Sequence, residues 1–205
     1  MRREKTLYSV IRVFLHYFFK IFFRCKIIGI ENIPVAGGAI IASNHVSLFD
    51  PPVVGTAFTR SIHFMAKEEL FAVPLIGWIV KNLNAFPVRR ATADRTAIRH
   101  AINLLENGEL LGLFPEGTRS RTGKLGKPET GLAMIALKAG VPIIPTAVIG
   151  TNKVWKEGQL FPRFIVKFGN PIIVNQGKAD KEAMENLSTK IMQEISLLLE
   201  EKVNF

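Results

Sequence analysis

The sequence predicts an α/β fold with a largely parallel sheet. Apolar runs typical of buried strands occur at 39–42, 110–114 and 141–149. Segments with helical periodicity lie between or after them, at 93–107, 131–139 and 178–201. Strands that alternate with helices favour parallel pairing, because a parallel connection needs a crossover that a helix commonly supplies.

Size and charge narrow the class of protein. The 205 residues suit a single main domain with a full core. There are 27 Lys and Arg against 17 acidic residues, a formal charge of +10, and mean hydropathy is +0.21. A basic, apolar-rich chain suggests an anionic partner such as a lipid surface or a phosphorylated substrate. With two Tyr, two Trp and no RNP-like or zinc-finger pattern, no nucleic-acid partner is expected.

Residues 7–23 form the most apolar segment. Basic residues recur every four positions through it and just after it, at Arg12, His16, Lys20 and Arg24. That spacing places the basic side chains along one face of a helix. The segment has no uninterrupted run of the ~20 apolar residues that a transmembrane helix needs. We expect residues 1–25 to anchor the protein at an anionic membrane surface, with the cations against lipid phosphates, and 26–205 to form the main domain. The alternative is a helix packed on the domain's own core.

The remaining elements follow from local patterns. Residues 52–58 and 68–82 read as helical, and the second of these is either membrane-facing or packed in the core. Strands are expected at 26–30, 61–67 and 163–169, the last with one solvent-facing side. The single Cys25 excludes an intrachain disulfide and a multi-cysteine metal site, which fits a reducing compartment.

Residues 44–50, Asn-His-Val-Ser-Leu-Phe-Asp, follow the apolar run at 39–42 and precede Pro51-Pro52, which can open a helix. His45 and Asp50 therefore bracket a turn at the end of a core strand, where α/β sheets place their chemistry. An Nδ1–H···carboxylate hydrogen bond across this turn would leave Nε2 free as a general base. From these residues alone, an N-cap aspartate beside an unrelated histidine is an equal reading.

A second motif, Phe-Pro-Glu-Gly-Thr-Arg-Ser at 114–120, follows the strand predicted at 110–114. Its glycine allows close backbone approach, its hydroxyls can bond a ligand, and the planar guanidinium of Arg119 suits phosphate. Alone, it could also be a charged hairpin turn.

Taken together, the two motifs resemble those of the glycerolipid acyltransferases, most closely the bacterial 1-acyl-sn-glycerol-3-phosphate acyltransferases, over roughly residues 26–175. The resemblance implies a mixed sheet flanked by helices, with the motif loops at one edge. It also implies that a third motif, ending at Arg89, holds the substrate phosphate. That motif usually opens with glycine, and Asn84 stands there in this chain. Because Asn tolerates positive φ, the turn should survive.

The reaction implied by the resemblance is acyl transfer from an acyl thioester to lysophosphatidate, giving phosphatidate. His45 would be the general base, oriented by Asp50. Arg89, Glu116, Gly117, Thr118 and Arg119 would bind the acceptor, with its phosphate near the two arginines. Glu116 would hold an arginine in place, which we prefer, or contact the glycerol hydroxyl. The backbone N–H groups of Gly117 and of neighbouring residues could stabilise the oxyanion.

The donor would be acyl-CoA or acyl carrier protein, with no bound cofactor and no metal, and the site of action would be the cytoplasmic face of the cell membrane. A basic loop at 121–127 either attracts an anionic substrate or is simply solvated. Three other functions remain open: acylation of glycerol-3-phosphate or another lysophospholipid, metal-dependent phosphoester hydrolysis, and non-catalytic binding to a lipid surface.

Overall fold

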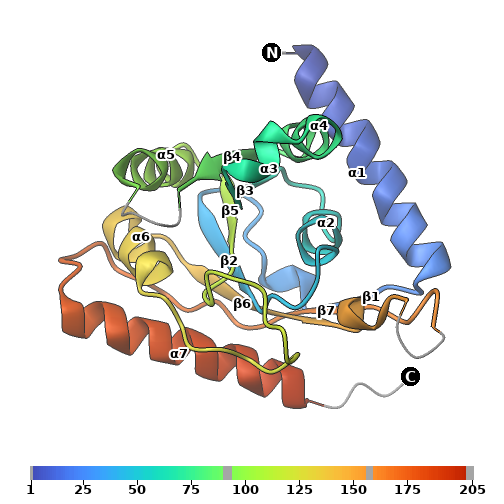
Figure 1. Ribbon diagram of the computed structural model, residues 1–205. Coiled ribbons are helices and arrows are strands. Elements are labelled where there is room, and N and C mark those ends of the chain that lie inside the picture. Colours follow the sequence, from blue (N-terminus) through green and yellow to red (C-terminus); the bar gives the residue numbers. More distant parts are fainter. Residues whose placement is uncertain (1, 90–93, 156–158, 202–205) are drawn as a thin grey trace.

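A seven-stranded sheet forms the centre of the computed structural model, which describes residues 2–89, 94–155 and 159–201 (Figure 1). The strand order is β1-β7-β6-β2-β5-β3-β4. All neighbouring pairs are parallel except β6 with β7, so the expectation of a mixed, largely parallel sheet is confirmed. The strands are β1 Lys26–Ile28, β2 Ala39–Ser43, β3 Ile62–Lys67, β4 Ala85–Val88, β5 Leu110–Leu113, β6 Ile143–Ile149 and β7 Ile165–Phe168.

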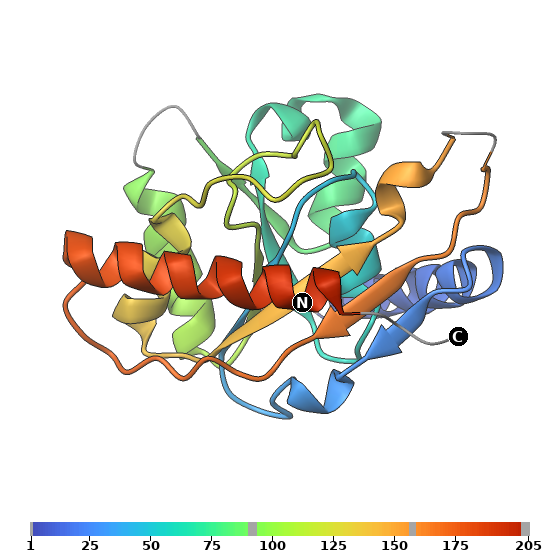
Figure 2. The same ribbon diagram turned by 90° about the horizontal axis from the view of Figure 1, so that it is seen from below.

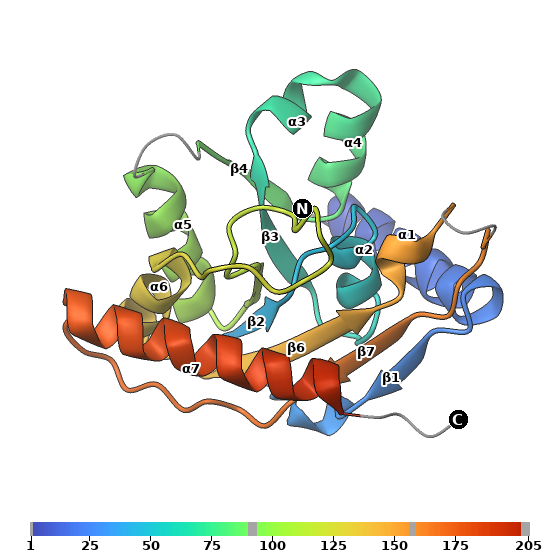
Figure 3. The same cartoon turned by 60° about the horizontal axis from the view of Figure 1, so that its bottom comes forward.

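Helices cover both faces of this sheet. On one face lie α5, α6 and α7, and the long helix α7 crosses the front of the sheet in Figure 2. On the other face lie α1 and α2, with α3 and α4 projecting beyond the sheet beside them (Figure 3). The helices are α1 Arg2–Phe22, α2 Asp50–Gly55, α3 Glu69–Ala72, α4 Pro74–Asn82, α5 Arg95–Glu106, α6 Gly131–Ala139 and α7 Lys181–Glu200, with short 3-10 turns η1 Ile30–Asn32 and η2 Thr151–Lys153.

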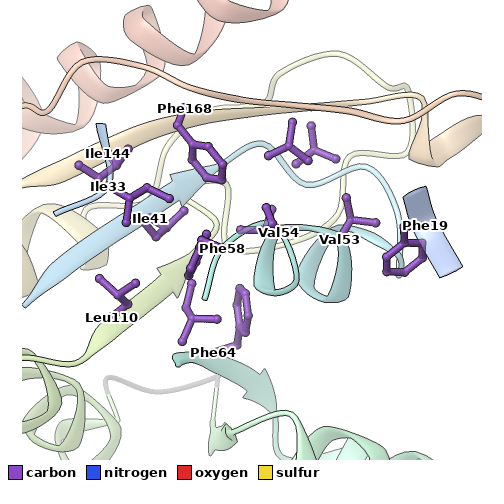
Figure 4. Packing of buried hydrophobic residues seen from close by; sticks show 14 of the residues in the cluster. Phe19, Ile33, Ile41, Val53, Val54, Phe58, Phe64, Leu110, Ile144 and Phe168 are labelled. Carbon is purple, nitrogen blue, oxygen red and sulfur yellow. The ribbon is translucent and has the colours of Figure 1, made fainter. Parts of the chain in front are cut away.

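The two faces of β2 show how the sheet is buried on both sides. Ile40 and Ala42 pack among residues of α5, α6 and α7, whereas Ala39 and Ile41 pack among residues of α1 and α2. Figure 4 shows the second of these clusters, with Ile41 and Phe64 of the sheet facing Val53 and Val54 of α2. Because side chains alternate between faces, a strand that is covered on both sides must be apolar throughout. This is why the continuous run at 39–42 was readable as a strand.

The helix expected at 7–23 is present as α1, but its basic residues lie differently from the prediction. Arg12 and His16 point into the protein, where they hydrogen-bond the backbone oxygens of Phe58 and Thr56 at 3.0 and 2.9 Å. Phe19 on the same side of the helix is buried in the core (Figure 4). The placement of these two cations against lipid phosphates was therefore wrong. The exposed part of α1 is instead rich in large apolar side chains and also carries Ser9 and Lys20. These apolar residues are Leu7, Val10, Val13, Phe14, Tyr17, Ile21 and Phe22.

Two strands differ from expectation. β7 is buried along its whole length, so the predicted solvent-facing side was wrong. Its Lys167 is 1% exposed and donates to the Leu198 and Glu201 carbonyl oxygens at the end of α7. β4 was not predicted. It contains Pro87, which an edge strand tolerates, and β4 is an edge of the sheet. The turn before it has Asn84 at φ 56°, as expected for an asparagine that replaces glycine.

Candidate active site

The functional motifs meet at one edge of the sheet because of the strand order. β6, β2 and β5 are adjacent and parallel, so their carboxyl ends lie side by side. The 44–50 turn leaves β2, the 114–120 motif leaves β5, and η2 leaves β6. Figure 3 shows the long loop after β5 passing close to the start of α2.

His45 and Asp50 form the pair expected from their spacing. His45 Nδ1 lies 2.9 Å from Asp50 Oδ2, and the two residues are 8% and 0% exposed. Asp50 opens α2, and Pro51 and Pro52 occupy its first turn as predicted. With Nδ1 engaged by the carboxylate, Nε2 is the ring nitrogen that remains for a substrate. The geometry is that of a histidine oriented to accept a proton.

The backbone of the 44–50 turn adds further bonds to Asp50. The N–H groups of Val46 and Ser47 both donate to Oδ2, each at 2.7 Å. The Asn44 side chain ties the turn to β6, accepting from the Val148 N–H at 2.7 Å and donating to the Val148 carbonyl oxygen at 3.0 Å. The pair is thus built on a turn that is fixed at both the carboxylate and the preceding strand.

An aromatic ring supports His45 from the second motif. The Phe114 ring stacks on the imidazole with centroids 4.0 Å apart and planes 19° from parallel. Phe64 of β3 stacks in turn on Phe114, at 6.2 Å. A side chain at Gly112 would collide with the Phe64 ring, so glycine at this position of β5 makes room for the stack. Stacking of this kind restricts the plane in which the imidazole lies.

Glu116 has a different partner from the arginine we expected. Its Oε1 accepts from the backbone N–H of His45 at 3.0 Å, and its Oε2 accepts from that of Gly126 at 2.8 Å. The Ser120 N–H also donates to the His45 carbonyl oxygen, at 2.8 Å. Glu116 therefore joins the two motifs and the loop that follows them, and the arginine partner was wrong.

Gly117 makes the tight turn that its position suggested, with φ 65°. However, its N–H donates to the Phe114 carbonyl oxygen at 2.9 Å. This donor is already used within the turn, so the expectation that the Gly117 N–H stabilises an oxyanion was wrong.

Two cavities flank this constellation. A mostly apolar cavity of about 740 Å³ lies toward α1, α2 and α4, and its lining includes His45, Phe64, Ile79, Phe114 and Arg119. A second, of about 690 Å³, lies toward α5 and α6, and its lining includes Arg89, Ile98, Glu116 and Ile135. Thr118 lines both.

The two arginines expected to share a phosphate thus line different cavities. Arg119 lies in the lining that includes His45, whereas Arg89 lies in the other. Arg89 is also largely exposed and pairs with Glu68, with Nε and Oε2 3.4 Å apart. Its neighbour Arg90 falls outside the described residues.

Other chemical groups contribute less. Burial raises the pKa of the Cys25 thiol to about 11. Because the thiolate is the reactive form, this cysteine is unsuited to carry an acyl group. Within the part of the chain that the structure describes, no group of three or more His, Cys, Asp and Glu could hold a metal ion.

One buried residue of the site has no counterpart in the sequence prediction. The Thr151 hydroxyl donates to Asp50 Oδ1 at 2.6 Å, from a position 101 residues away along the chain. Threonine after a strand is common and carries no distinctive signal. Only the pairing of β2 with β6 brings it to the carboxylate.

Comparisons with known proteins fit this geometry. A family model described as Acyltransferase matches residues 24–149. The chain is 34% identical over 139 residues to the 1-acyl-sn-glycerol-3-phosphate acyltransferase of Bacillus subtilis, covering 66% of this chain and 69% of that protein. It is 32% identical over 140 residues to the chloroplastic 1-acyl-sn-glycerol-3-phosphate acyltransferase LPAT1 of Arabidopsis thaliana, covering 67% of this chain and 39% of that one. The chain spans about two-fifths of the length of such chloroplast relatives.

A solved structure is similar over the whole fold. The crystal structure of the 1-acyl-sn-glycerophosphate (LPA) acyltransferase PlsC from Thermotoga maritima superposes with a TM-score of 0.76 at 30% sequence identity. The match covers 99% of this chain and 84% of that one. The α/β sheet, the paired His45 and Asp50 and the family match lead to one conclusion: the chain belongs to the acyltransferase family.

Proposed function

We propose that this protein transfers an acyl chain from a thioester to the free hydroxyl of 1-acyl-glycerol-3-phosphate, giving phosphatidate. The observation that carries the proposal is the His45–Asp50 pair, 2.9 Å apart, whose His45 lies on the wall of a large, mostly apolar cavity. Relatives in Bacillus subtilis and Borreliella burgdorferi are named for this activity. An apolar cavity beside a poised base suits a substrate with a long hydrocarbon chain.

In the proposed mechanism the acceptor hydroxyl is the nucleophile. His45 Nε2 removes its proton as the oxygen attacks the thioester carbonyl carbon, and Asp50 stabilises the resulting imidazolium. The tetrahedral intermediate collapses, the carbon–sulfur bond breaks, and the thiolate leaves and takes the proton. No acyl-enzyme is required, because the thiolate is already a good leaving group.

We assign the binding of the acceptor phosphate mainly to Arg119. Arg119 and His45 line the same cavity. One acceptor molecule can therefore place its phosphate at Arg119 and its free hydroxyl at His45 Nε2. Thr118 lines the same cavity and offers a hydroxyl. Arg89 would act from the far side of Thr118, at the rim of the second cavity.

This assignment predicts unequal effects of the two arginines. Arg119→Ala should raise KM for lysophosphatidate roughly tenfold to hundredfold, the cost of losing a charge-assisted hydrogen bond, with a smaller change in kcat. Arg89→Ala should raise KM less. Arg99→Ala, an exposed arginine on α5, is the matched control and should leave KM unchanged. A larger effect for Arg89 than for Arg119 would move the phosphate to the second cavity.

The donor in this proposal is acyl-CoA or acyl carrier protein. Both carry the acyl group as a thioester on an anionic carrier. The exposed loop after the second motif bears Arg121, Lys124 and Lys127. The loop begins beside the site, because Ser120, the last residue of the motif, donates its N–H to the His45 carbonyl oxygen. Its positive charge would favour approach of either donor.

We further propose that the protein works at the cytoplasmic face of a membrane, bound by α1 together with α4. The exposed side of α1 includes Val13, Phe14 and Tyr17, and α4, which contacts α1, exposes Leu75 and Trp78. The cavity beside His45 is lined by residues of both helices, which suits entry of a lipid chain from this side. None of the helices described is long and apolar enough to cross a membrane. Attachment would therefore be interfacial, aided by the net charge of +10.

Charged residues on this apolar surface should weaken membrane binding. Phe14→Glu combined with Leu75→Glu should lower the fraction bound to anionic vesicles roughly tenfold, because two large apolar side chains leave the interface. Leu197→Glu on α7, an exposed leucine on the opposite face of the sheet, is the control and should bind like the wild type. Binding is measured by co-sedimentation. Equal binding of both variants would exclude the surface formed by α1 and α4 as the main attachment.

The activity itself is tested with purified protein and vesicles. Acyl transfer is measured from acyl-CoA and from acyl carrier protein, with lysophosphatidate, glycerol-3-phosphate and lysophosphatidylcholine as competing acceptors. Phosphatidate as the main product supports the proposal and identifies the donor. Preferred acylation of another acceptor would keep the reaction class and change the substrate, and no product from any pair would exclude acyl transfer.

A further inference from the structure

Thr151 contacts the carboxylate of Asp50 on the side away from the 44–50 turn. Its hydroxyl donates to Oδ1 at 2.6 Å, and the residue is 1% exposed. His45, Val46 and Ser47 all bond the other oxygen, Oδ2. Each carboxylate oxygen therefore has its own donors, and those donors come from two distant parts of the chain.

The backbone around Thr151 explains how it reaches this position. β6 ends at Ile149, and Gly150 turns the chain with φ 92°, where a side chain would collide with the Arg163 carbonyl oxygen. The next residue, Thr151, opens η2. The end of β6 is also held to the 44–50 turn by the two bonds between Asn44 and Val148. The Thr151 hydroxyl is thus presented from a fixed strand end.

A carboxylate bonded through one oxygen can still rotate about its Cβ–Cγ bond. Donors that engage both oxygens restrict that rotation. Rotation matters here because Oδ2 must remain in line with His45 Nδ1, and misplacement by a fraction of an ångström lowers the rate of proton transfer.

We propose that Thr151 is a positioning residue for acyl transfer, fixing the plane of the Asp50 carboxylate so that Oδ2 holds the imidazole of His45. The inference rests on the proposed roles of His45 and Asp50. Thr151 has no contact with substrate in this scheme and acts only through Asp50. It also lies just beyond the part of the chain that matches the family model, 24–149.

A buried threonine could instead serve packing alone, and three substitutions separate the two roles. Thr151→Val keeps the shape and removes the hydroxyl, whereas Thr151→Ser keeps the hydroxyl and removes a methyl group. The matched control is Thr146→Val. Thr146 is a buried threonine of β6 whose hydroxyl donates to the Ile144 carbonyl oxygen.

The expected result is a change in kcat that follows the hydroxyl. Thr151→Val should lower kcat roughly tenfold to hundredfold, as expected for a lost hydrogen bond to a charged group, with both KM values within about twofold of wild type. Thr151→Ser and Thr146→Val should stay within about threefold. If Thr151→Val does not fold, as judged by circular dichroism, Thr151→Ala takes its place.

A spectroscopic measurement tests the same geometry without turnover. The proton on His45 Nδ1, bonded to Asp50, should give a low-field NMR signal that His45→Ala lacks. That signal should shift or broaden in Thr151→Val and persist in Thr151→Ser and Thr146→Val.

The outcomes separate the inference from the proposed function. Wild-type kcat and an unchanged signal in Thr151→Val would overturn the inference, as would an equal loss in Thr151→Ser. A signal that changes only when the hydroxyl is lost, in a protein that acylates none of the acceptors tested, would support the positioning by Thr151 and exclude the proposed reaction.

Discussion

Replacing His45 with alanine is expected to lower the rate of phosphatidate formation by roughly two to four orders of magnitude. The acceptor hydroxyl is a weak nucleophile until its proton is removed. The proposed base is His45, which lines the cavity and is paired with the buried carboxylate of Asp50. Glu116 is unsuited to replace it, because both of its carboxylate oxygens accept backbone N–H groups. The nearest carboxylate, Asp50, is 0% exposed and engaged by four donors.

The control for this experiment is His100→Ala. His100 is an exposed histidine of α5, so its removal should leave kcat within about twofold of wild type. Initial rates are measured at saturating acceptor and donor, after circular dichroism has shown that both variants are folded. Activity of His45→Ala within about threefold of wild type would remove His45 as the base.

The sequence was most informative where one local rule decided the structure. The buried strands β2, β5 and β6 are continuous apolar runs, and the geometry of a parallel sheet places their carboxyl ends together. The spacing of His45 and Asp50 across one turn was sufficient to predict their hydrogen bond. In these cases the residues that determine the structure are close together in the chain.

The errors arise where a distant segment decides the environment. The solvent-facing side predicted for β7 is covered by α7, whose last carbonyl oxygens accept from Lys167. The basic residues of α1 follow the predicted periodicity, but Arg12 and His16 meet carbonyl oxygens after α2 rather than solvent or lipid. Periodicity identifies which residues share a face, and the partner of that face depends on the tertiary fold.

The same reasoning accounts for the partners of the His45–Asp50 pair. Glu116 bonds the His45 backbone from 71 residues away, and Thr151 bonds Asp50 from 101 residues away. Neither partner could be chosen from residue type alone, since carboxylates and hydroxyls are frequent in loops. The His45–Asp50 pair was predictable from one short motif, whereas the bonds from Glu116 and Thr151 that position it required the sheet topology.

Replacing Asp50 with asparagine is expected to lower kcat by roughly three to four orders of magnitude while the fold is retained, in analogy with the effect of the same change in a serine-protease triad. The Thr151 hydroxyl can accept as well as donate, so it can turn to receive a hydrogen bond from the asparagine amide. The asparagine oxygen can then face the Val46 and Ser47 N–H groups and His45 Nδ1. The geometry survives, but the negative charge that stabilises the imidazolium is gone.

Asp50→Ala should differ from Asp50→Asn in stability as well as in rate. It leaves the half-buried donors at Val46 and Ser47 and the buried hydroxyl of Thr151 without their acceptor, which should lower the free energy of unfolding by about 3 kcal/mol. Urea unfolding and kcat are measured for both variants. A stable Asp50→Asn protein with nearly no turnover would separate the charge of Asp50 from its structural role. If instead Asp50→Asn turned over within about tenfold of wild type, the imidazolium would not depend on this carboxylate, and Asp50 would act only through the hydrogen bonds that shape the turn.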